Sequence, residues 1–292
     1  MKYIYLFVLL LFGLSGCVKN NPLPVWLEIN NWTLNANPNP STAPNSNPGA
    51  LTHNFSDVWV YIDGKVIGVF EVPCKIPVLV SGTCNIILRP TIRNNGVSIT
   101  KKAYPFVQQF ETTLDLTEGE TYTIDPTTYY ASSTTFHVED FENNSITIQK
   151  DASVSSPNLD LDIESNSSIG PWGRYGHLKL TTENSLWIGV LPPLGLPKSG
   201  REVYLEINYR TTNSILTGML EYQVSGSIID HDGFSIARQQ TSDYTWKKIY
   251  IDLKDIVSNT PNGISYKQYL KMQLDSDLSS SDVYIDNIKV VF

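Results

Sequence analysis

Residues 58–70 read Val-Trp-Val-Tyr-Ile-Asp63-Gly64-Lys-Val-Ile-Gly-Val-Phe, two runs rich in β-branched and aromatic side chains that are joined by an Asp-Gly pair. A two-residue hairpin turn needs positive φ at both positions, which Asp and Gly accept, so this stretch predicts a β-hairpin. Other short runs of the same kind, separated by turn residues, lie on both sides of it. Strands at this spacing predict a small, immunoglobulin-like β-sandwich over residues 24–131.

One long segment interrupts this pattern. Residues 35–50 read NANPNPSTAPNSNPGA and contain no Leu, Ile, Val or aromatic side chain. A stretch of this composition has no apolar surface to contribute to a core. We therefore expect a disordered-like loop between two strands of the first sandwich.

The second unit, residues 132–292, also consists of short apolar runs separated by turn residues, for example Val203–Tyr209 and Val283–Val291. The chain has 292 residues with 18 Gly, 17 Pro and 16 Tyr, a composition that favours sheets and turns over long helices. We therefore expect an all-β protein, with a second β-sandwich after the first. A net charge of −8 without any basic run makes nucleic acid an unlikely partner class on electrostatic grounds.

Two stretches of the second unit resemble the galactose-binding-like jelly roll found in many carbohydrate-binding modules. They are Asp140-Phe141-Glu142 at its opening and Asp282-Val-Tyr-Ile-Asp286-Asn287-Ile-Lys-Val290 at its close. The resemblance implies a C-terminal jelly roll whose first and last strands lie side by side. It also implies a structural calcium ion held by Asp140, Glu142 and Asp286, since carboxylates supply part of the oxygen shell that calcium requires. The alternative is that these acids lie in solvated turns, as most surface acids do.

The chain opens with Lys2, an apolar run from Tyr3 to Leu14, and the sequence Leu-Ser-Gly-Cys17. An apolar run this short cannot span a bilayer as a helix, which takes roughly 20 residues, and it is typical of a secretory signal. Its end resembles the lipobox of bacterial lipoproteins, and the chain resembles lipoproteins of the Bacteroidota. The resemblance implies a signal peptide over 1–16, acylation of Cys17 and a lipidated tether over 17–23. The alternative is an ordinary cleavage site beside an incidental Cys.

An acylated Cys17 predicts a protein that is anchored to the outer membrane and does not span it. The periplasmic and the cell-surface faces both remain open. The two other cysteines, Cys74 and Cys84, flank Ser81-Gly82, and two strands joined by a turn there would bring them within bridging distance. A disulfide and two small buried thiols are both compatible with this spacing.

The loop Pro171-Trp172-Gly173-Arg174-Tyr175-Gly176 is the strongest glycan-binding candidate in the sequence. A sugar stacks its apolar face on aromatic rings while a guanidinium donates hydrogen bonds to its hydroxyls, which assigns these roles to Trp172, Arg174 and Tyr175. The alternative is that the indole closes one end of the sandwich core.

A second candidate surface is Gly189-Val-Leu-Pro-Pro-Leu-Gly-Leu-Pro197, an apolar stretch in what we expect to be a loop. Exposed apolar residues in a loop indicate a contact with protein or lipid, so Val190, Leu191, Leu194 and Leu196 are candidates for docking. The alternative is that the loop folds back over one end of the jelly roll.

The sequence favours a binding protein over an enzyme. Its four His residues are scattered without metal-ligand spacing, and it contains no P-loop, dinucleotide fingerprint or Gly-x-Ser-x-Gly. We expect a non-catalytic lipoprotein that docks as an accessory subunit of an outer-membrane protein complex for assembly, transport or uptake. The alternative is a glycan-binding lipoprotein that uses its jelly roll, and a glycan-active enzyme comes third. Calcium is the one cofactor that the resemblance implies.

Overall fold

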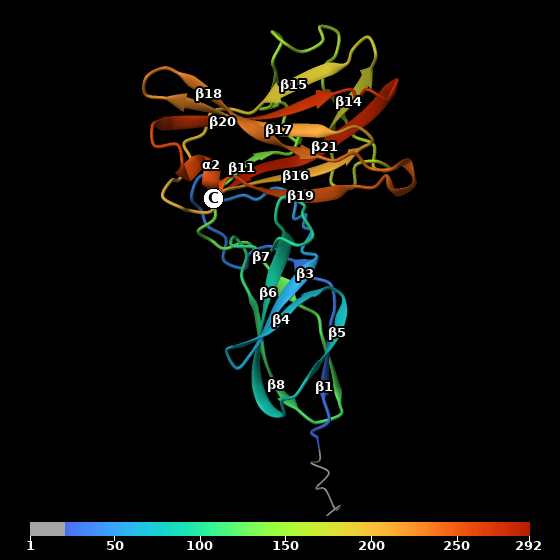
Figure 1. The fold of residues 1–292 in the computed structure, drawn as a ribbon, viewed down its shortest axis with the longest axis vertical. Helices are drawn as coiled ribbons and strands as arrows, with labels where there is room; N and C mark the ends of the chain where they lie inside the picture. Colours follow the sequence, from blue (N-terminus) through green and yellow to red (C-terminus); the bar gives the residue numbers. More distant parts are fainter. Residues whose placement is uncertain (1–20) are drawn as a thin grey trace, which may run out of the picture.

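The computed structural model describes residues 21–292, apart from the side chain of Asp232. The predicted all-β class is confirmed: two β-sandwiches follow one another along the long axis of the molecule (Figure 1). Among residues 21–292, no helix has the length and apolar character needed to cross a membrane. Cys17 and the segment that resembles a signal peptide lie outside the described residues.

The first sandwich contains ten strands. They are β1 (Val25–Ile29), β2 (Thr33–Leu34), β3 (Asp57–Ile62), β4 (Lys65–Glu71), β5 (Cys74–Val78), β6 (Gly82–Arg93), β7 (Lys101–Ala103), β8 (Phe110–Leu116), β9 (Thr121–Ile124) and β10 (Thr127–Thr128). One main sheet has the order β5-β1-β9, and the other has the order β4-β3-β6-β7 with β8 also paired to β6. The inward side chains of both sheets form one hydrophobic core.

The hairpin that the sequence predicts is β3-β4. Its turn residues Asp63 and Gly64 have φ of 47° and 75°, and Ile62 pairs with Lys65 across it. The alternation in β1 places Val25, Leu27 and Ile29 in the core. Local pattern and turn chemistry therefore decide this part of the fold.

The second sandwich contains two larger sheets. Its strands and helical turns are β11 (Phe136–Glu139), β12 (Gln149–Lys150), β13 (Asp162–Glu164), β14 (Tyr175–Thr181), β15 (Leu186–Val190), β16 (Tyr204–Thr211), β17 (Ile215–Gln223), β18 (Ile228–Ile236), η1 (Thr241–Asp243), β19 (Lys247–Asp252), α2 (Lys254–Ser258), β20 (Gly263–Gln273) and β21 (Ser280–Val291). The six-stranded sheet runs β13-β14-β21-β16-β19, with β11 beside β21, and the five-stranded sheet runs β12-β15-β20-β17-β18. The first and last strands are thus neighbours, as the resemblance implies.

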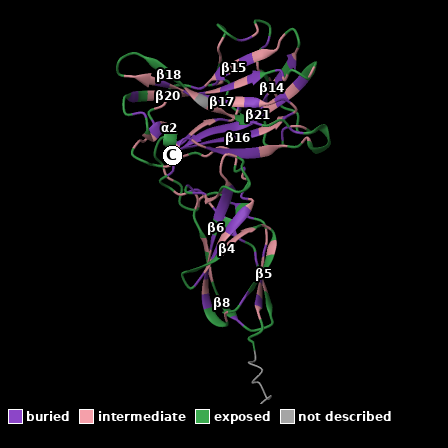
Figure 2. Ribbon diagram, viewed as in Figure 1, coloured by how far each residue is buried: buried purple, intermediate pink, exposed green. Residues whose placement is uncertain are grey.

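The two sheets have different surroundings. The six-stranded sheet faces the first sandwich, whereas the five-stranded sheet lies at the far end of the molecule (Figure 1). The described chain begins at the opposite end, below β1, and Phe292 lies at the junction, where its backbone bonds to Thr135. Buried residues concentrate between the two sheets and at the junction (Figure 2).

A buried charge cluster lies at the centre of the junction. Glu206 on β16 is fully buried, pairs with Lys248 on β19 at 2.6 Å, and accepts hydrogen bonds from the hydroxyls of Tyr104 and Tyr130 in the first sandwich. The Lys248 ammonium also donates to the carbonyl and the hydroxyl of Thr52, at 2.9 and 3.0 Å. The bonds from Tyr104, Tyr130 and Thr52 cross between the sandwiches, so the buried Glu206–Lys248 pair links the two units at their junction.

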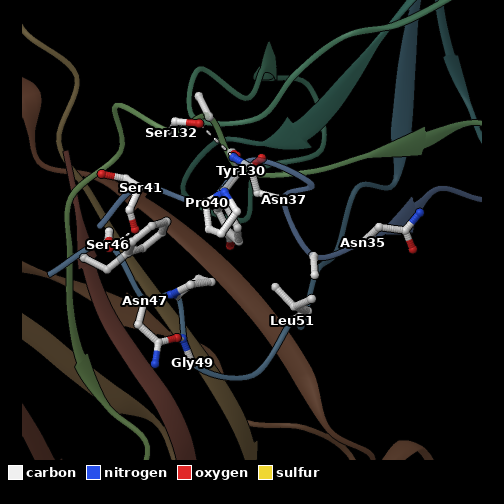
Figure 3. A pocket seen from close by; sticks show the side chains of 14 residues that line it. Asn35, Asn37, Pro40, Ser41, Ser46, Asn47, Gly49, Leu51, Tyr130 and Ser132 are labelled. Carbon is white, nitrogen blue, oxygen red and sulfur yellow. Dashed lines mark hydrogen bonds between the residues drawn. The ribbon is translucent and has the colours of Figure 1, made fainter. Parts of the chain in front are cut away.

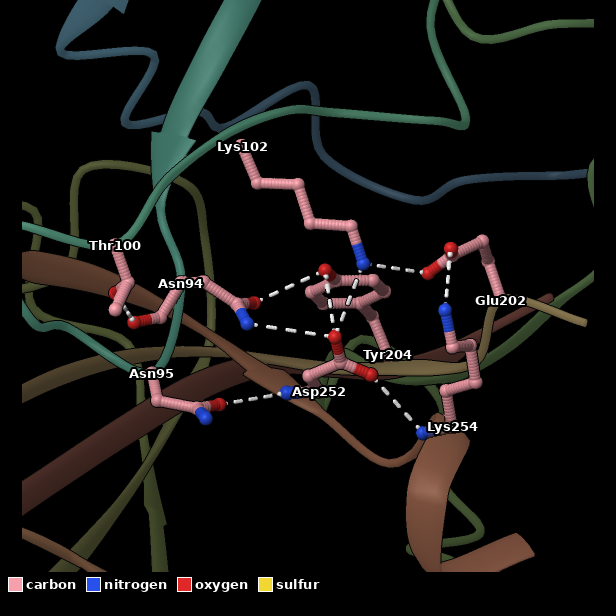
Figure 4. A network of polar contacts seen from close by, with 8 residues as sticks. All are labelled: Asn94, Asn95, Thr100, Lys102, Glu202, Tyr204, Asp252 and Lys254. Atoms are coloured by element: carbon pink, nitrogen blue, oxygen red, sulfur yellow. Dashed lines mark hydrogen bonds and ion pairs between the residues drawn. The ribbon is translucent and has the colours of Figure 1, made fainter. Parts of the chain in front are cut away.

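A second polar network borders this cluster (Figure 4). Lys102 on β7 bridges the carboxylates of Glu202 and Asp252, at 2.8 and 3.0 Å. The side-chain oxygen of Asn95 accepts the Asp252 N–H at 2.8 Å, and the Tyr204 hydroxyl also reaches the Asp252 carboxylate, at 3.1 Å. Contacts from both sandwiches thus converge on one edge of the six-stranded sheet.

Residues 35–50 form a loop between β2 and β3, and hydrogen bonds connect this loop to the junction. Asn37 donates to the carbonyl of Tyr130 at 2.8 Å, Ser132 donates to the carbonyl of Asn39 at 2.8 Å, and the Asn45 carbonyl accepts the N–H of Phe136 at 2.7 Å. The loop and the junction enclose an uncharged cavity of about 260 Å³ (Figure 3). The Asn and Ser side chains of the loop are too polar to enter a core, but Asn37 forms a hydrogen bond with a backbone group at the junction.

His53 beside this junction makes stability depend on pH. Its ring stacks on Phe55 with 4.9 Å between centroids, and burial, followed by the charge of Lys248, lowers the pKa of His53 from 6.5 to about 4. Because the folded-state pKa is depressed, the stability that neutral His53 contributes is present above pH 6.5 and is lost as the pH falls toward 4. We expect His53→Phe, which keeps the stack and cannot titrate, to lose less stability than wild type over this window. Urea unfolding across the window measures this, and identical pH dependence in both proteins would contradict it.

Candidate functional site

The outer face of the five-stranded sheet points away from the first sandwich (Figure 1). Alternate residues of β17 and β20 are half-buried there, while their neighbours point into the core. We call this surface the Tyr269 face. It comprises Ile188 and Val190 on β15, Leu216, Gly218, Leu220 and Tyr222 on β17, Asp230 on β18, and Lys267, Tyr269 and Lys271 on β20.

A glycine determines how Tyr269 lies on this face. Gly218 is the cross-strand partner of Tyr269, and a Cβ at Gly218 would collide with the ring and hydroxyl of Tyr269. The ring therefore lies flat across β17, and its hydroxyl donates to Asp230 on the next strand at 3.1 Å. Glycine in a strand interior is otherwise unfavourable, so its presence here is explained by this close approach.

Polar and apolar groups surround the ring. The Lys267 ammonium lies 5.0 Å from the centroid of the Tyr222 ring, and Lys271 lines a shallow hollow of about 350 Å³ at one end of the face. Ser214, Ser235, Gln273 and Asp275 also line this hollow. Flat aromatic and aliphatic surface beside amine, amide and hydroxyl groups is a combination that can contact one face of a sugar ring and the hydroxyls at its edge.

The three residues predicted to bind glycan do not form a platform. Tyr175 is 0% exposed, and its hydroxyl donates to Glu164 at 2.9 Å, so burial and this bond raise the pKa of Tyr175 to about 12. The Arg174 guanidinium is directed to the carbonyl of Asn143, at 3.3 Å. Trp172 is 37% exposed and is the one ring of the loop that a ligand could reach. Tyr175 is the first residue of β14, which places it inside the sandwich.

Trp172 belongs to a cluster of aromatic rings on the six-stranded sheet. It contacts Trp246 edge-on at 5.5 Å, and Tyr284 is stacked against His177 at 4.4 Å. Arg210 lies over the Tyr244 ring at 4.3 Å from its centroid. These rings cover one another, so the cluster packs this side of the jelly roll and offers little open ring surface.

The predicted calcium ligands lie close enough together for their charges to interact. Burial raises the pKa of Asp286 to about 7, and the charges of Asp140 and Glu142 add to this rise. Each carboxylate accepts a separate backbone N–H: Asp140 from Glu142 at 3.2 Å, Glu142 from Arg174 at 2.6 Å, and Asp286 from Asn287 at 2.6 Å. Within residues 21–292, no three His, Cys, Asp or Glu side chains are grouped as ligands for a metal ion. The side-chain oxygen of Asn287 is buried and has no hydrogen-bond partner among the described residues. One such oxygen atom supplies only a small part of the six to eight oxygen ligands that calcium requires.

A buried lysine lies near these acids. Lys289 on β21 is fully buried, and its ammonium donates to the carbonyl of Ala50 at 2.7 Å. Burial, followed by the charge of Lys248, lowers the pKa of Lys289 to about 7, against the opposing effect of Glu206, Asp286 and Asp140.

We expect EDTA to leave the thermal midpoint unchanged, because each of the three carboxylates already accepts a hydrogen bond from a backbone N–H group. Differential scanning calorimetry in calcium-free buffer, with and without EDTA and then with added calcium, measures this. A midpoint that falls with EDTA and recovers with calcium would restore the calcium prediction.

The apolar loop over residues 189–197 covers one end of the jelly roll. Leu191 and Leu196 are buried in its core, and Leu194 forms a β-bridge with Tyr266 through two backbone hydrogen bonds, at 2.8 and 2.9 Å. Val190 is half-buried on the Tyr269 face. Leu191 and Leu196 are therefore not available for docking, because burial in the core gives their apolar side chains a better environment than water, and the loop folds back over one end of the jelly roll.

Of the two alternatives for Cys74 and Cys84, the structure has two free thiols, of which Cys84 is buried and Cys74 half-buried. Cys74 begins β5, which pairs with β1, whereas Cys84 lies on β6, which pairs with β3 and β8 in the other sheet. The turn near Ser81-Gly82 links two sheets and does not close a hairpin. Burial raises the pKa of both thiols.

Sequence reasoning missed the Tyr269 face. The available signal was Gly218 in the middle of an otherwise regular strand pattern, which indicates a close approach by another group. Its partner Tyr269 is distant in sequence, and only strand pairing brings the two together.

No protein family and no curated protein sequence matches the chain. Among solved structures, the family 11 carbohydrate-binding module of a cellulosomal cellulase of Clostridium thermocellum is similar over 53% of this chain and 93% of the module, with 16% identity and a TM-score of 0.33. A carbohydrate-binding module from the β-sandwich superfamily is similar over 80% of this chain and 84% of that chain, with 15% identity and a TM-score of 0.37. The enzymatically active domain of tailspike protein 4 of bacteriophage CBA120 is similar over 53% of this chain, with 10% identity and a TM-score of 0.38, and the match spans only 20% of that chain. These identities and scores are too low to transfer a ligand or a binding residue.

Proposed function

We propose that this protein is a non-catalytic, lipid-anchored glycan-binding protein that holds its ligand on the Tyr269 face. The observation that carries the proposal is the Tyr269 ring, which lies flat over Gly218 on an outward sheet face with amine and carboxylate groups around it. A sugar that stacks there removes the ring and the neighbouring aliphatic side chains from water while its hydroxyls reach the polar groups. Burial of one large apolar side chain contributes about 1.5–3 kcal/mol, so one stacked ring supplies a substantial part of a weak, reversible affinity.

The position of the face supports a role in presentation. The described chain begins at the end of the molecule opposite to the five-stranded sheet (Figure 1). An acyl group on Cys17 would therefore hold the Tyr269 face away from the bilayer, with the first sandwich as a spacer. The anchor would attach the protein to the outer membrane, and both its periplasmic side and its cell-surface side are compatible with this arrangement. Mass spectrometry of the mature chain tests the anchor: we expect an acylated N-terminal Cys17, and an unmodified chain that starts elsewhere would remove it.

Retention of the purified chain on a panel of immobilised polysaccharides tests the glycan proposal. The panel contains neutral β-glucan and xylan together with polygalacturonate, alginate and a sulfated galactan. We expect specific retention by at least one of them, and equal retention of Trp172→Ala, because that indole lies on the other sheet. No retention by any member would overturn the proposal, and loss of retention in Trp172→Ala would move the site to the 171–176 loop.

Docking within an outer-membrane protein complex is the second candidate function. One corner of the jelly roll carries exposed aliphatic side chains at the end of the β17-β18 hairpin and the start of β20, where Val224 is 77%, Ile228 57% and Ile264 60% exposed. Apolar groups gathered at one corner favour contact with another protein. A pull-down in mild detergent tests this function. Partners that are lost when Val224 and Ile264 are both changed to Ser would support it, and recovery of the bait alone would count against it.

A further inference from the structure

We infer that the ligand of the Tyr269 face is an anionic glycan, one whose sugar rings carry carboxylate or sulfate groups. The inference rests on the proposed function, since it specifies the ligand class of the same site. It is carried by two lysines that flank the central ring and by the balance of described charges on the face.

Lys267, Tyr269 and Lys271 are successive outward residues of β20. With a rise of about 3.4 Å per residue, each lysine Cα lies about 7 Å from that of Tyr269, on opposite sides along the strand. A sugar stacked on the Tyr269 ring would thus have an ammonium group within reach on either side. This arrangement suits a chain in which charged rings repeat along the polymer.

The two lysines lack carboxylate partners among the described residues. The ion pairs of described lysines involve Lys101, Lys102, Lys150, Lys247, Lys248 and Lys254. Lys267 instead lies over the Tyr222 ring, and Lys271 borders the open hollow. In a chain of net charge −8, two half-buried lysines on one face that form no ion pair with a described side chain leave local positive charge for a ligand.

The described acid on the face is Asp230, which accepts the hydroxyl of Tyr269 at 3.1 Å and keeps its negative charge. Asp275 borders the hollow, accepts the backbone N–H of Ser214 at 3.1 Å and lies 3.5 Å from the guanidinium of Arg238. On the face itself, the two ammonium groups of Lys267 and Lys271 therefore outweigh the one carboxylate of Asp230, and the described groups leave local positive charge for a bound glycan.

The test compares Lys267→Gln, Lys271→Gln and the double variant with wild type on the same polysaccharide panel. The matched control is Lys179→Gln, which removes an exposed lysine from β14 of the other sheet. Because exposed charge pairs are individually weak, we expect each single variant to weaken retention on anionic members about two- to fivefold, and the double variant about tenfold or more. Lys179→Gln should behave as wild type, and added salt should weaken wild type more than the double variant.

Several outcomes separate this inference from the proposed function. Retention on polygalacturonate is compared with retention on its methyl ester, which differs in the charge of the carboxylate. Retention on the sulfated galactan is compared with retention on its desulfated form, which differs in the sulfate. Stronger binding of a charged form than of its neutral counterpart supports the inference. Retention only by neutral polysaccharides, with all lysine variants unchanged, would overturn it and leave the glycan function in place. Retention by no polysaccharide would overturn both.

Discussion

Glu206→Gln is expected to lower the free energy of unfolding by about 3–5 kcal/mol, because it leaves a buried ammonium without its counter-charge. Lys248 is 1% exposed at its side chain and lies 2.6 Å from the Glu206 carboxylate. The amide of Gln keeps an oxygen that accepts from Tyr104 and Tyr130, so the loss of charge is the main change. Urea unfolding monitored by fluorescence measures the effect.

Two controls determine whether the buried charge is the cause. Asp160→Asn removes a carboxylate that is 77% exposed and pairs with Lys150 at 2.9 Å, and it should cost less than about 1 kcal/mol. Lys248→Met in the Glu206→Gln background should recover part of the loss, because no unpaired charge then remains buried. A cost for Glu206→Gln as small as that of Asp160→Asn would contradict the description of the junction as one buried, charge-paired unit.

Tyr269→Ala is expected to weaken glycan binding about 10- to 100-fold. The substitution removes a stacking surface worth about 1.5–3 kcal/mol when it is covered, and tenfold corresponds to 1.4 kcal/mol. Since Tyr269 is half-buried on the outer side of β20, its truncation leaves the inward core residues of the strand in place. Isothermal titration with the polysaccharide that is retained most strongly measures the change.

Tyr269→Phe is the matched control. It keeps the ring over Gly218 and removes only the hydroxyl bonded to Asp230, so we expect binding within about threefold of wild type. If Tyr269→Phe and Tyr269→Ala weakened binding equally, the ligand would be recognised through the hydroxyl and not through the ring. If neither had an effect, the ligand would lie elsewhere on the molecule.

Local chemistry made much of the fold predictable. The Asp63-Gly64 turn, the alternation in β1 and the short runs of the second unit each specify a strand or a hairpin without reference to distant residues. The adjacency of β11 and β21 came from a resemblance and agrees with their pairing. These features depend on periodicity and turn geometry, which a sequence displays directly.

The site was less predictable because it depends on strand order and burial. Tyr175 is equally aromatic whether it faces a ligand or a core, and only its place in β14 decides that it is buried. Leu191 and Leu196 illustrate the same ambiguity, since an apolar loop closes a core as readily as it docks a partner. The flat ring of Tyr269 needs Gly218 beneath it, and strand pairing alone brings these two residues together.

Amide chemical-shift mapping with a captured oligosaccharide tests most directly where the protein binds its ligand. The proposed site predicts that the largest shifts on titration fall on β17 and β20 around Gly218 and Tyr269, with Trp172 and the first sandwich unchanged. Largest shifts in the 171–176 loop or in the first sandwich, with β17 and β20 unmoved, would contradict it.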